Sequence, residues 1–239
     1  MGGPTHDLVC LQRPIVRSTV RPDPVPDDTD RRPVVAFDFD GTLTRRDTLR
    51  VFLGQVGRPS VVAAAFARHL PSVLRAYQGD EARNRAKESV FSDILGGLHE
   101  DEAEAAASAT ARTVVRSMFK PDVVARLRWH QEAGHRVIVV SASFRHYVAP
   151  VVATLGVDEV LATRWEVDPA TSRLTGRFDG VNVRGEAKVD LLSQHLGRPC
   201  RLEYAYGNSS GDVALLAAAR YPVWIGRTPI DERPGNGPK

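Results

Sequence analysis

Short apolar runs and longer amphipathic segments alternate along this chain, and the alternation predicts an α/β fold. The short runs are typical of buried parallel strands, and the amphipathic segments are typical of helices. The strand-like runs cover residues 34–39, 136–140, 159–162, 164–167, 173–178, 202–206 and 223–225, and helical patterns cover 121–133, 144–155, 186–196 and 212–219. Because parallel strands are joined by right-handed crossovers, we expect one parallel sheet with residues 34–39 near its centre. Residues 164–167 and 173–178 predict a hairpin or flap.

One block interrupts this alternation. Between residues 45 and 120 there is no good strand run, and the pattern predicts helices at 48–54, 60–77, 82–95 and 100–118. We therefore expect an all-helical cap over residues 47–119, inserted into an α/β core made of residues 33–46 and 120–228. Residues 1–32, rich in Pro, Asp, Arg and Thr, and residues 229–239 are expected to be disordered tails.

Composition narrows the class of protein. In 239 residues, 32 Lys and Arg face 29 Asp and Glu, a formal charge of +3, so no basic footprint for nucleic acid is indicated. Cys10 and Cys200 are far apart and form no Cys-x-x-Cys motif, which argues against a disulfide framework or a zinc site. No apolar run is long enough to span a membrane, and residues 1–32 have no signal-peptide core, so we expect a cytoplasmic protein.

The first strand ends on two acids that predict chemistry. Asp38 and Asp40 follow Val34–Phe37 and precede Gly41-Thr42. In an open α/β sheet, ligands bind where the central strands end. Two carboxylates at that point suit a site where one attacks and the other transfers protons. The segment also resembles a calcium loop, but Leu49 stands where such a loop needs its final glutamate.

Three further segments follow that motif in order: a strand ending in serine at 137–143, a lysine near a helix start at 185–189, and a Gly-Asn-Ser-Ser-Gly-Asp loop within 206–212. With residues 34–44 they resemble the four motifs of the haloacid dehalogenase (HAD) superfamily, in its phosphoserine-phosphatase-like branch (subfamily IB). The resemblance covers roughly residues 33–226. It implies a Rossmann-like parallel sheet with an inserted helical cap, and a phosphatase that hydrolyses phosphate monoesters with Mg²⁺.

The resemblance also implies roles for the acids. Asp38 would be the nucleophile that forms an aspartyl-phosphate, and Asp40 would be the general acid and base. The metal would be held by Asp38, by Asp40 through its backbone carbonyl, and by Asn208 and Asp212. Asn208 departs from the family, which commonly has an aspartate there. An amide oxygen ligates Mg²⁺ without adding negative charge, so either Asn208 and Asp212 share the ion with Asp38, or the site is weak. The extreme of the second case is a phosphate-binding scaffold.

The phosphate would be bound by Ser141, by the backbone amide of Ala142, by Lys188 and by Thr42. Ser143 competes with Ser141 for this role, or it is the N-cap of the next helix. In the absence of the motif, Lys188 would be a solvated residue of a helix start.

The sequence says less about the part of the substrate beyond the phosphate group. Asp47 lies where phosphoserine-specific relatives have a glutamate, or it caps the helix at 48–54. Arg83 and Lys87, one turn apart, would meet a substrate anion or form a solvated face. We expect a small phosphorylated metabolite, such as an amino-acid or amino-alcohol phosphate. The alternative is a phosphatidylglycerophosphate-type lipid, for which the apolar and basic helix at 60–77 would give peripheral membrane contact, although packing within the cap also explains it.

Two other readings of the sequence concern the reaction. A phosphotransferase, with a second alcohol in place of water, shares every motif with a phosphatase. A receiver domain phosphorylated on aspartate shares the sheet, but the helical insert and the continuation Asp40-Gly41-Thr42 argue against it. The oligomeric state is not constrained by any of these patterns.

Overall fold

The structure is a computed structural model that describes residues 30–56, 58–75, 80–157 and 159–227. Within these ranges the side chains of residues 73–75, 80, 81, 83 and 84 are not described. Apart from residues 30–32, both expected tails therefore lie outside the described residues.

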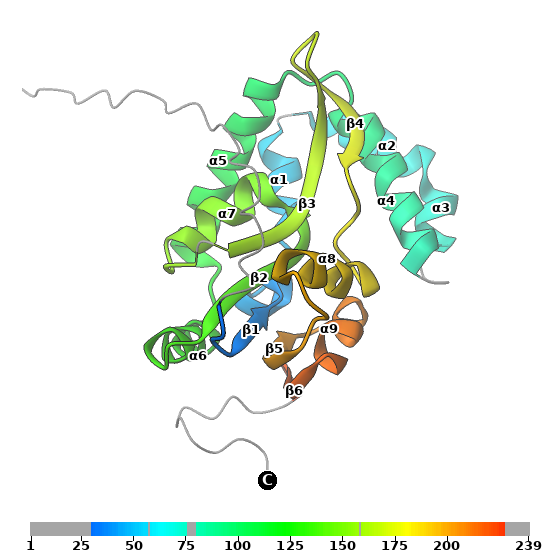
Figure 1. Ribbon diagram of the computed structural model, residues 1–239. Coiled ribbons are helices and arrows are strands. Elements are labelled where there is room, and N and C mark those ends of the chain that lie inside the picture. The colour runs from blue at the N-terminus through cyan, green and yellow to red at the C-terminus, as the bar shows by residue number, and fades with distance from the viewer. Residues whose placement is uncertain (1–29, 57, 76–79, 158, 228–239) are drawn as a thin grey trace, which may run out of the picture.

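The described residues form one six-stranded sheet in the order β4-β3-β2-β1-β5-β6 (Figure 1). The strands are β1 (Val34–Phe37), β2 (Arg136–Phe144), β3 (Glu159–Asp168), β4 (Arg173–Asp179), β5 (Leu202–Gly207) and β6 (Ala219–Trp224). The strand β1 pairs in parallel with β2 and with β5, and only β4 runs antiparallel to its neighbour. The predicted α/β class and the central place of the first strand are confirmed.

Helices cover both faces of this sheet. They are α1 (Leu49–Gln55), α2 (Pro59–Arg68), α3 (Leu70–Arg75), α4 (Asp80–Leu95), α5 (Glu100–Ser117), α6 (Pro121–Glu132), α7 (Arg145–Ala153), α8 (Glu186–Leu196) and α9 (Val213–Ala217). Alternate residues of β1 belong to two separate apolar clusters. Val35 and Phe37 pack on the side of α6 and α7, and Val34 and Ala36 pack on the side of α8 and α9. The central strand is thus buried on both faces, as a parallel strand requires.

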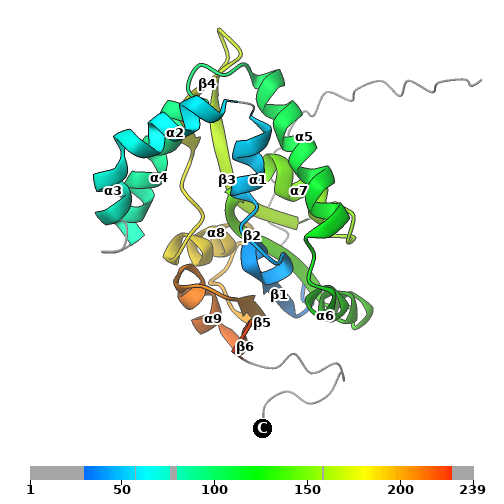
Figure 2. The same ribbon diagram turned by 180° about the vertical axis from the view of Figure 1, so that it is seen from behind.

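The helices between β1 and α6 lie beside a long hairpin. The strands β3 and β4 extend past the rest of the sheet, with α2, α3 and α4 on one side and α1, α5 and α7 on the other (Figures 1 and 2). The helix α4 packs on β4, and α5 packs on α7 and α1. The expected hairpin and the run of helices are confirmed, while their division into a cap and a core stays a prediction.

Several boundaries differ from the prediction. The single helix expected at 60–77 is two helices, α2 and α3, separated at His69. The runs 159–162 and 164–167 are one strand, β3. The last strand begins at Ala219 rather than at residue 223, because Ala219 already pairs with Leu202. It includes Pro222, which an edge strand tolerates because one row of its amides has no partner strand.

The surface of α2 and α3 carries exposed apolar side chains. Phe66 is 42% exposed and Leu70 is 52% exposed. No helix within the described ranges is both long and apolar enough to cross a bilayer. Peripheral contact with a membrane through this surface stays a prediction.

Candidate active site

The carboxyl ends of β2, β1 and β5 bring the predicted motifs together. Asp38 directly follows β1, and its backbone N–H donates to the carbonyl of Tyr206 in β5 at 2.9 Å. Ser141 lies in β2, which pairs with β1 on the other side. Asn208 follows β5. The sheet therefore positions three of the four motifs at one edge, as expected of a parallel arrangement.

The fourth motif supplies a cation to this edge. Lys188, in the first turns of α8, donates to Oδ1 of Asp38 and to Oδ1 of Asp212, at 2.6 Å in both cases. All three side chains are buried. Burial raises the pKa of Asp38, and the charge of Lys188 opposes this effect. Burial is also the largest single effect on Asp212, but the charge of Lys188 and the hydrogen bonds from Lys188 and Ser209 together outweigh it, so the pKa of Asp212 is lowered. One lysine thus contacts two buried carboxylates, and it offsets the burial of Asp38 only in part.

Asp40 lies in a different environment from Asp38. Its Oδ1 accepts hydrogen bonds from the backbone N–H and the hydroxyl of Thr48, at 2.7 Å each, and its Oδ2 accepts one from the hydroxyl of Ser143. These hydrogen bonds favour the ionised form, but burial has the larger effect and raises the pKa of Asp40 to about 6. A carboxyl with a pKa near neutrality is suited to giving and taking a proton.

The loop after β5 is held by Asp212. Its Oδ2 accepts hydrogen bonds from the backbone N–H of Asn208 at 3.1 Å, and from the N–H and hydroxyl of Ser209 at 2.9 and 2.8 Å. A Cβ on Gly207 would lie 2.4 Å from the Cβ of Asp212, so only glycine allows this approach. The amide oxygen of Asn208 accepts a hydrogen bond from the hydroxyl of Thr42 at 3.1 Å. The first and fourth motifs are therefore in direct contact.

The oxygen atoms near Asp38 fit a magnesium ion better than a softer metal. No three His, Cys, Asp or Glu side chains gather as a metal cluster in the part of the chain that the structure describes. Mg²⁺ needs few protein carboxylates, because it keeps several waters and binds phosphate oxygens. Asp38, the carbonyl of Asp40 and the amide oxygen of Asn208 match that preference. Asp212 already accepts from Lys188 and from the loop, so its contacts favour holding those groups in place, and its role as a ligand stays a prediction.

The two serines after β2 have different contacts. The hydroxyl of Ser141 accepts from the backbone N–H of Ser143 at 3.0 Å, and its side chain is buried. The hydroxyl of Ser143 donates to Asp40, and the N-cap of α7 is Phe144 without any side-chain cap. The expectation that Ser143 is a helix N-cap is therefore wrong. The reason is that β2 continues to Phe144, so Ser143 lies within the strand, one residue before the N-cap of α7, and its side chain contacts Asp40.

Lys87 connects α4 to Ser141-Ala142 in β2, the segment predicted to bind the phosphate. Its Nζ donates to the carbonyl of Ala142 at 2.6 Å and to Oδ1 of Asn182 at 2.7 Å. It also lies 5.4 Å from the ring centre of Phe178 and 5.7 Å from that of Phe144. Burial lowers the pKa of Lys87 to about 8, so the ammonium group stays mostly charged at neutral pH.

The positions of Asp47 and Arg83, the other two predicted substrate residues, say less about substrate binding. Asp47 is exposed, and its Oδ1 accepts from the backbone N–H of Leu49 at 2.8 Å. The N-cap of α1 is Thr48, so the alternative that Asp47 is this N-cap is wrong. The charge of Asp47 nevertheless raises the pKa of Asp40, after the larger effect of burial. The side chain of Arg83 lies outside the described residues.

Sequence reasoning missed several residues of this site. Thr48 and Asn182 were not singled out, although each holds a predicted functional side chain. Lys120 was not singled out either, and its Nζ donates to the carbonyl of Gly41. A threonine before a helix start is a signal that could have drawn attention to Thr48. Nothing in the pattern around Asn182 or Lys120 indicated their contacts.

Comparisons with known proteins agree with this geometry. The family model described as haloacid dehalogenase-like hydrolase matches residues 35–217. Protein CicA of Caulobacter vibrioides is 36% identical over 186 residues, which cover 78% of this chain and 82% of that protein. A phosphoserine phosphatase of Halobacterium salinarum is 31% identical over 207 residues, which cover 84% of this chain and 87% of that enzyme.

Solved structures show the same fold. A protein of unknown function from Bordetella pertussis Tohama I has a TM-score of 0.68 at 28% identity, over 81% of this chain and 89% of that chain. A phosphoserine phosphatase carrying an analogue of the phospho-aspartyl intermediate has a TM-score of 0.56 at 20% identity, over 82% and 87%. Together with the family match and the two relatives, these findings establish that the chain belongs to the haloacid dehalogenase-like hydrolases and is a phosphatase of the phosphoserine-phosphatase-like type.

Proposed function

We propose that this protein hydrolyses the phosphate monoester of a small metabolite through an aspartyl-phosphate on Asp38, with Mg²⁺ bound beside it. The observation that carries the proposal is the buried contact between Asp38 and Lys188 at the carboxyl end of the central strand. A carboxylate needs no deprotonation in order to attack, but it repels the phosphate. A nearby cation reduces that repulsion, and phosphoryl transfer depends mainly on such charge neutralisation and positioning.

The reaction has two displacements at phosphorus. In the first, a carboxylate oxygen of Asp38 forms a bond to phosphorus while the bond to the ester oxygen breaks. In the second, a water oxygen bonds to phosphorus and the acyl phosphate bond breaks, which frees phosphate and restores Asp38. Lys188 stays next to Asp38 throughout and neutralises its charge together with that of the phosphate oxygens. The hydroxyl of Ser141 and the amide of Ala142 are proposed to bind one of those oxygens.

Asp40 supplies the proton in the first step and removes one in the second. A carboxyl with a pKa of about 6 is present in both forms near neutral pH, which suits this double role. The hydrogen bonds from Thr48 and Ser143 fix its orientation. A phosphate-binding scaffold would gain little from such a group.

When bound by Asp38, the carbonyl of Asp40 and Asn208, Mg²⁺ supplies positive charge to the phosphate oxygens. Because Asn208 is neutral, the protein contributes one negative charge fewer than an aspartate at this position would. We therefore expect a weaker affinity for Mg²⁺ than the Asn208→Asp variant has.

The substrate is proposed to be an amino-acid or amino-alcohol phosphate or a molecule of similar size. The support is the cation that α4 places beside the phosphate-binding segment, where Lys87 lies against the carbonyl of Ala142. We propose that Lys87 contacts the part of the substrate beyond the phosphate. The enzymes named as phosphoserine phosphatases among the relatives make such a substrate the first to test.

The experiment is phosphate release from p-nitrophenyl phosphate and from O-phosphoserine over a range of Mg²⁺ concentrations, for the wild type, Asp38→Asn and Asn208→Asp. We expect activity that requires Mg²⁺ and that disappears in Asp38→Asn. Asn208→Asp should reach half-maximal activity at a Mg²⁺ concentration about tenfold lower, the size expected of one added ligand charge.

Two results would contradict the proposal. Activity that survives in Asp38→Asn would exclude the aspartyl-phosphate. A wild type that is inactive at every Mg²⁺ concentration, beside an active Asn208→Asp variant, would identify the natural protein as a phosphate-binding descendant of such enzymes.

A further inference from the structure

The outer face of α2 and α3 is mainly apolar. Packing within the fold accounts for Ala65, which is buried, and for Val62, which packs against the same apolar cluster. It does not account for Phe66 and Leu70, which lie four residues apart and are both exposed. From position 59 to 71, the other exposed residues are three alanines, two prolines, one serine and one arginine. These exposed residues, here named the α2–α3 face, offer mainly hydrocarbon to the solvent.

The helix α5 shows that this is not a general property of the surface. Its exposed residues are two acids, two arginines and two serines, together with Ala105 and Val115. Such a polar face is typical of a solvated helix. A single exposed valine is common on a soluble protein, whereas neighbouring exposed apolar side chains mark an interaction surface. The α2–α3 face is of the second kind.

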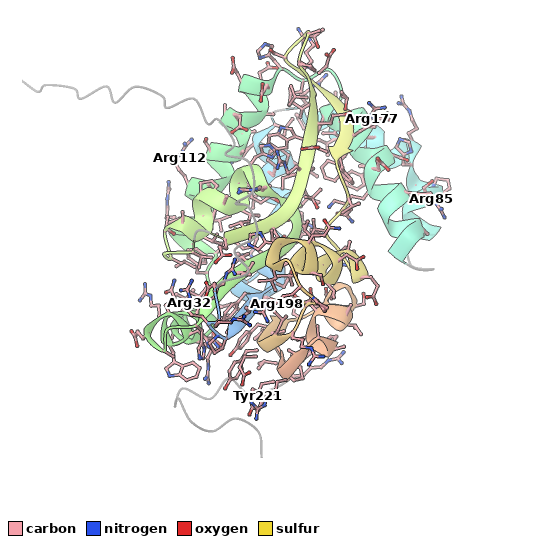
Figure 3. All side chains as sticks on the ribbon, in the orientation of Figure 1. Arg32, Arg85, Arg112, Arg177, Arg198 and Tyr221 are labelled. Carbon is pink, nitrogen blue, oxygen red and sulfur yellow. The ribbon has the colours of Figure 1, made fainter. Side chains whose placement is uncertain are left out.

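The charge along this segment has one sign. Between positions 48 and 79 the sequence has no Asp or Glu, and its basic residues are Arg50, Arg58, Arg68, His69 and Arg75. Arg58 precedes α2 and Arg68 ends it, so a positive charge stands at each end of that helix. Acids return only with α4, whose Asp93 contacts Arg68 at 2.7 Å and His69 at 3.1 Å and offsets part of the charge. The same helix, which packs on α2 and α3, also carries Arg85 (Figure 3).

We infer that the α2–α3 face is a membrane-binding surface whose partner is a bilayer that contains anionic lipids. An interfacial helix places its apolar side chains at the boundary between headgroups and acyl chains, and its basic residues are attracted to the anionic headgroups. Phe66 and Leu70 are the side chains that enter this boundary, and Arg58 and Arg68 face the headgroups. The inference goes beyond the proposed function and does not depend on it, because none of these residues belongs to the candidate active site.

Two other partners fit this face less well. A second copy of the chain would bring Arg58 and Arg68 of both copies together, and like charges across an interface repel each other. An acidic protein would need well-packed anchor side chains, whereas alanine is the most frequent residue of this face and projects little. A bilayer needs no matching shape, because its acyl chains fill the space around any side chain.

The test is co-sedimentation of the full chain with vesicles of phosphatidylcholine, alone or with about 30% phosphatidylglycerol. The partition coefficient should be about tenfold higher on the anionic vesicles, and it should fall as the salt concentration rises. The double variant Phe66→Ser with Leu70→Ser should lower it about tenfold, because two apolar side chains no longer leave water. Arg58→Gln should lower it about three- to fivefold, the effect of one basic residue near the headgroups.

Each of these variants has a matched control. Val115→Ser with Val213→Ser removes two exposed apolar side chains from α5 and α9, away from the α2–α3 face. Arg112→Gln removes one charge from α5, on the other side of the long hairpin of β3 and β4 (Figures 2 and 3). Both controls should bind the anionic vesicles as the wild type does.

The outcomes separate this inference from its alternatives. Equal or absent binding on the two kinds of vesicle overturns it, and so does an equal loss in the serine variants and in their controls. A wild-type dimer that dissociates in Phe66→Ser with Leu70→Ser, measured by analytical ultracentrifugation without vesicles, overturns it in favour of a second copy. A protein that binds the anionic vesicles through this face but hydrolyses no phosphate ester supports the inference and contradicts the proposed function.

Discussion

A small network of charged side chains lies at each end of the central strands. The two networks differ in how far neighbouring charges and hydrogen bonds offset the effect of burial on the carboxylates. At the amino end, Arg136 of β2 donates to both carboxylate oxygens of Glu159 in β3, at 2.6 to 2.9 Å. His195 of α8 adds a contact to Glu159 at 2.8 Å. Burial would raise the pKa of Glu159, but His195 and Arg136 together outweigh it and lower the pKa to about 2.

At the carboxyl end the balance is the opposite. Burial is the largest effect on both Asp38 and Asp40, and it raises the pKa of each carboxyl in spite of Lys188 and the hydrogen bonds from Thr48 and Ser143. A group that is more stable in its charged form in the folded protein contributes to stability, whereas a group whose charge is incompletely compensated is available to react. The comparison therefore predicts that the network at the amino end mainly stabilises the fold and that the carboxylates at the carboxyl end take part in the proposed reaction.

Among the substitutions that test this comparison, the largest effect is expected at Asp40. Asp40→Asn removes the proton donor and acceptor but keeps a similar shape, so kcat should fall by about 10²- to 10⁴-fold, the usual contribution of general acid–base catalysis. The free energy of unfolding should not fall by a comparable amount, since a neutral group replaces a buried, incompletely compensated carboxyl. Steady-state kinetics with O-phosphoserine and urea unfolding measure the two quantities. A variant that unfolds much more easily but turns over normally would contradict this prediction.

The next largest effect is expected at the amino end. Glu159→Gln leaves the guanidinium of Arg136 without its charged partner, and it should lower the free energy of unfolding at pH 7 by about 2–3 kcal/mol, less than for a fully buried pair because Glu159 is partly exposed. The pKa of Glu159 is lowered from 4.5 to about 2, so this contribution is complete above pH 4.5 and is lost as the pH falls toward 2. Urea titrations at pH 7 and pH 3 test both statements.

The control for Glu159 is a surface pair between the same residue types. Glu203→Gln removes the exposed contact with Arg220, and it should change the free energy of unfolding by about 0.5 kcal/mol or less. The kcat of folded Glu159→Gln should equal that of the wild type. A loss of turnover in that variant would mean that the amino end also serves the reaction.

The sequence predicted the carboxyl end better than the amino end, and the reason is physical. The strand before Asp38 is buried on both faces, so its apolar run and the acids that follow it are visible without knowledge of the fold. Parallel pairing then places the ends of neighbouring strands together. The network of Arg136, Glu159 and His195 has no local signal, because its members are brought together only by the sheet and by α8.

The same limit applies within the site. Ser143 contacts Asp40 across a separation of 103 residues, and Lys87 contacts Asn182 across 95. Motif spacing indicated which residues are candidates for the reaction, while the partners that hold them depend on where β2 ends and how α4 packs. The break between α2 and α3 at His69 was also unpredictable from periodicity, since both helices continue one apolar pattern.

The smallest effect concerns a buried histidine that packs against β1 and β5. His130 of α6 is fully buried, with its Nε2 at 2.8 Å from the hydroxyl of Tyr206 and its Nδ1 at 2.8 Å from Nδ1 of His135. Burial lowers its pKa from 6.5 to about 3, and the charges of His135 and Arg126 act in the same direction. His130 therefore stays neutral in the folded protein at pH values where the unfolded chain takes up a proton.

This difference predicts how stability depends on pH. The contribution of neutral His130 is complete above pH 6.5 and is lost as the pH falls toward 3. Between pH 7 and pH 4.5, His130→Gln should lose about 2 kcal/mol less of its free energy of unfolding than the wild type loses, whatever its stability at pH 7. Tyr206→Phe is the control, because it removes the hydroxyl partner but leaves His130 buried, and it should keep the wild-type slope. Equal slopes in His130→Gln and the wild type would show that His130 already becomes protonated in the folded state. The folded protein would then accept a positive charge on His130. Buried charges with incomplete compensation would therefore not be confined to Asp38 and Asp40.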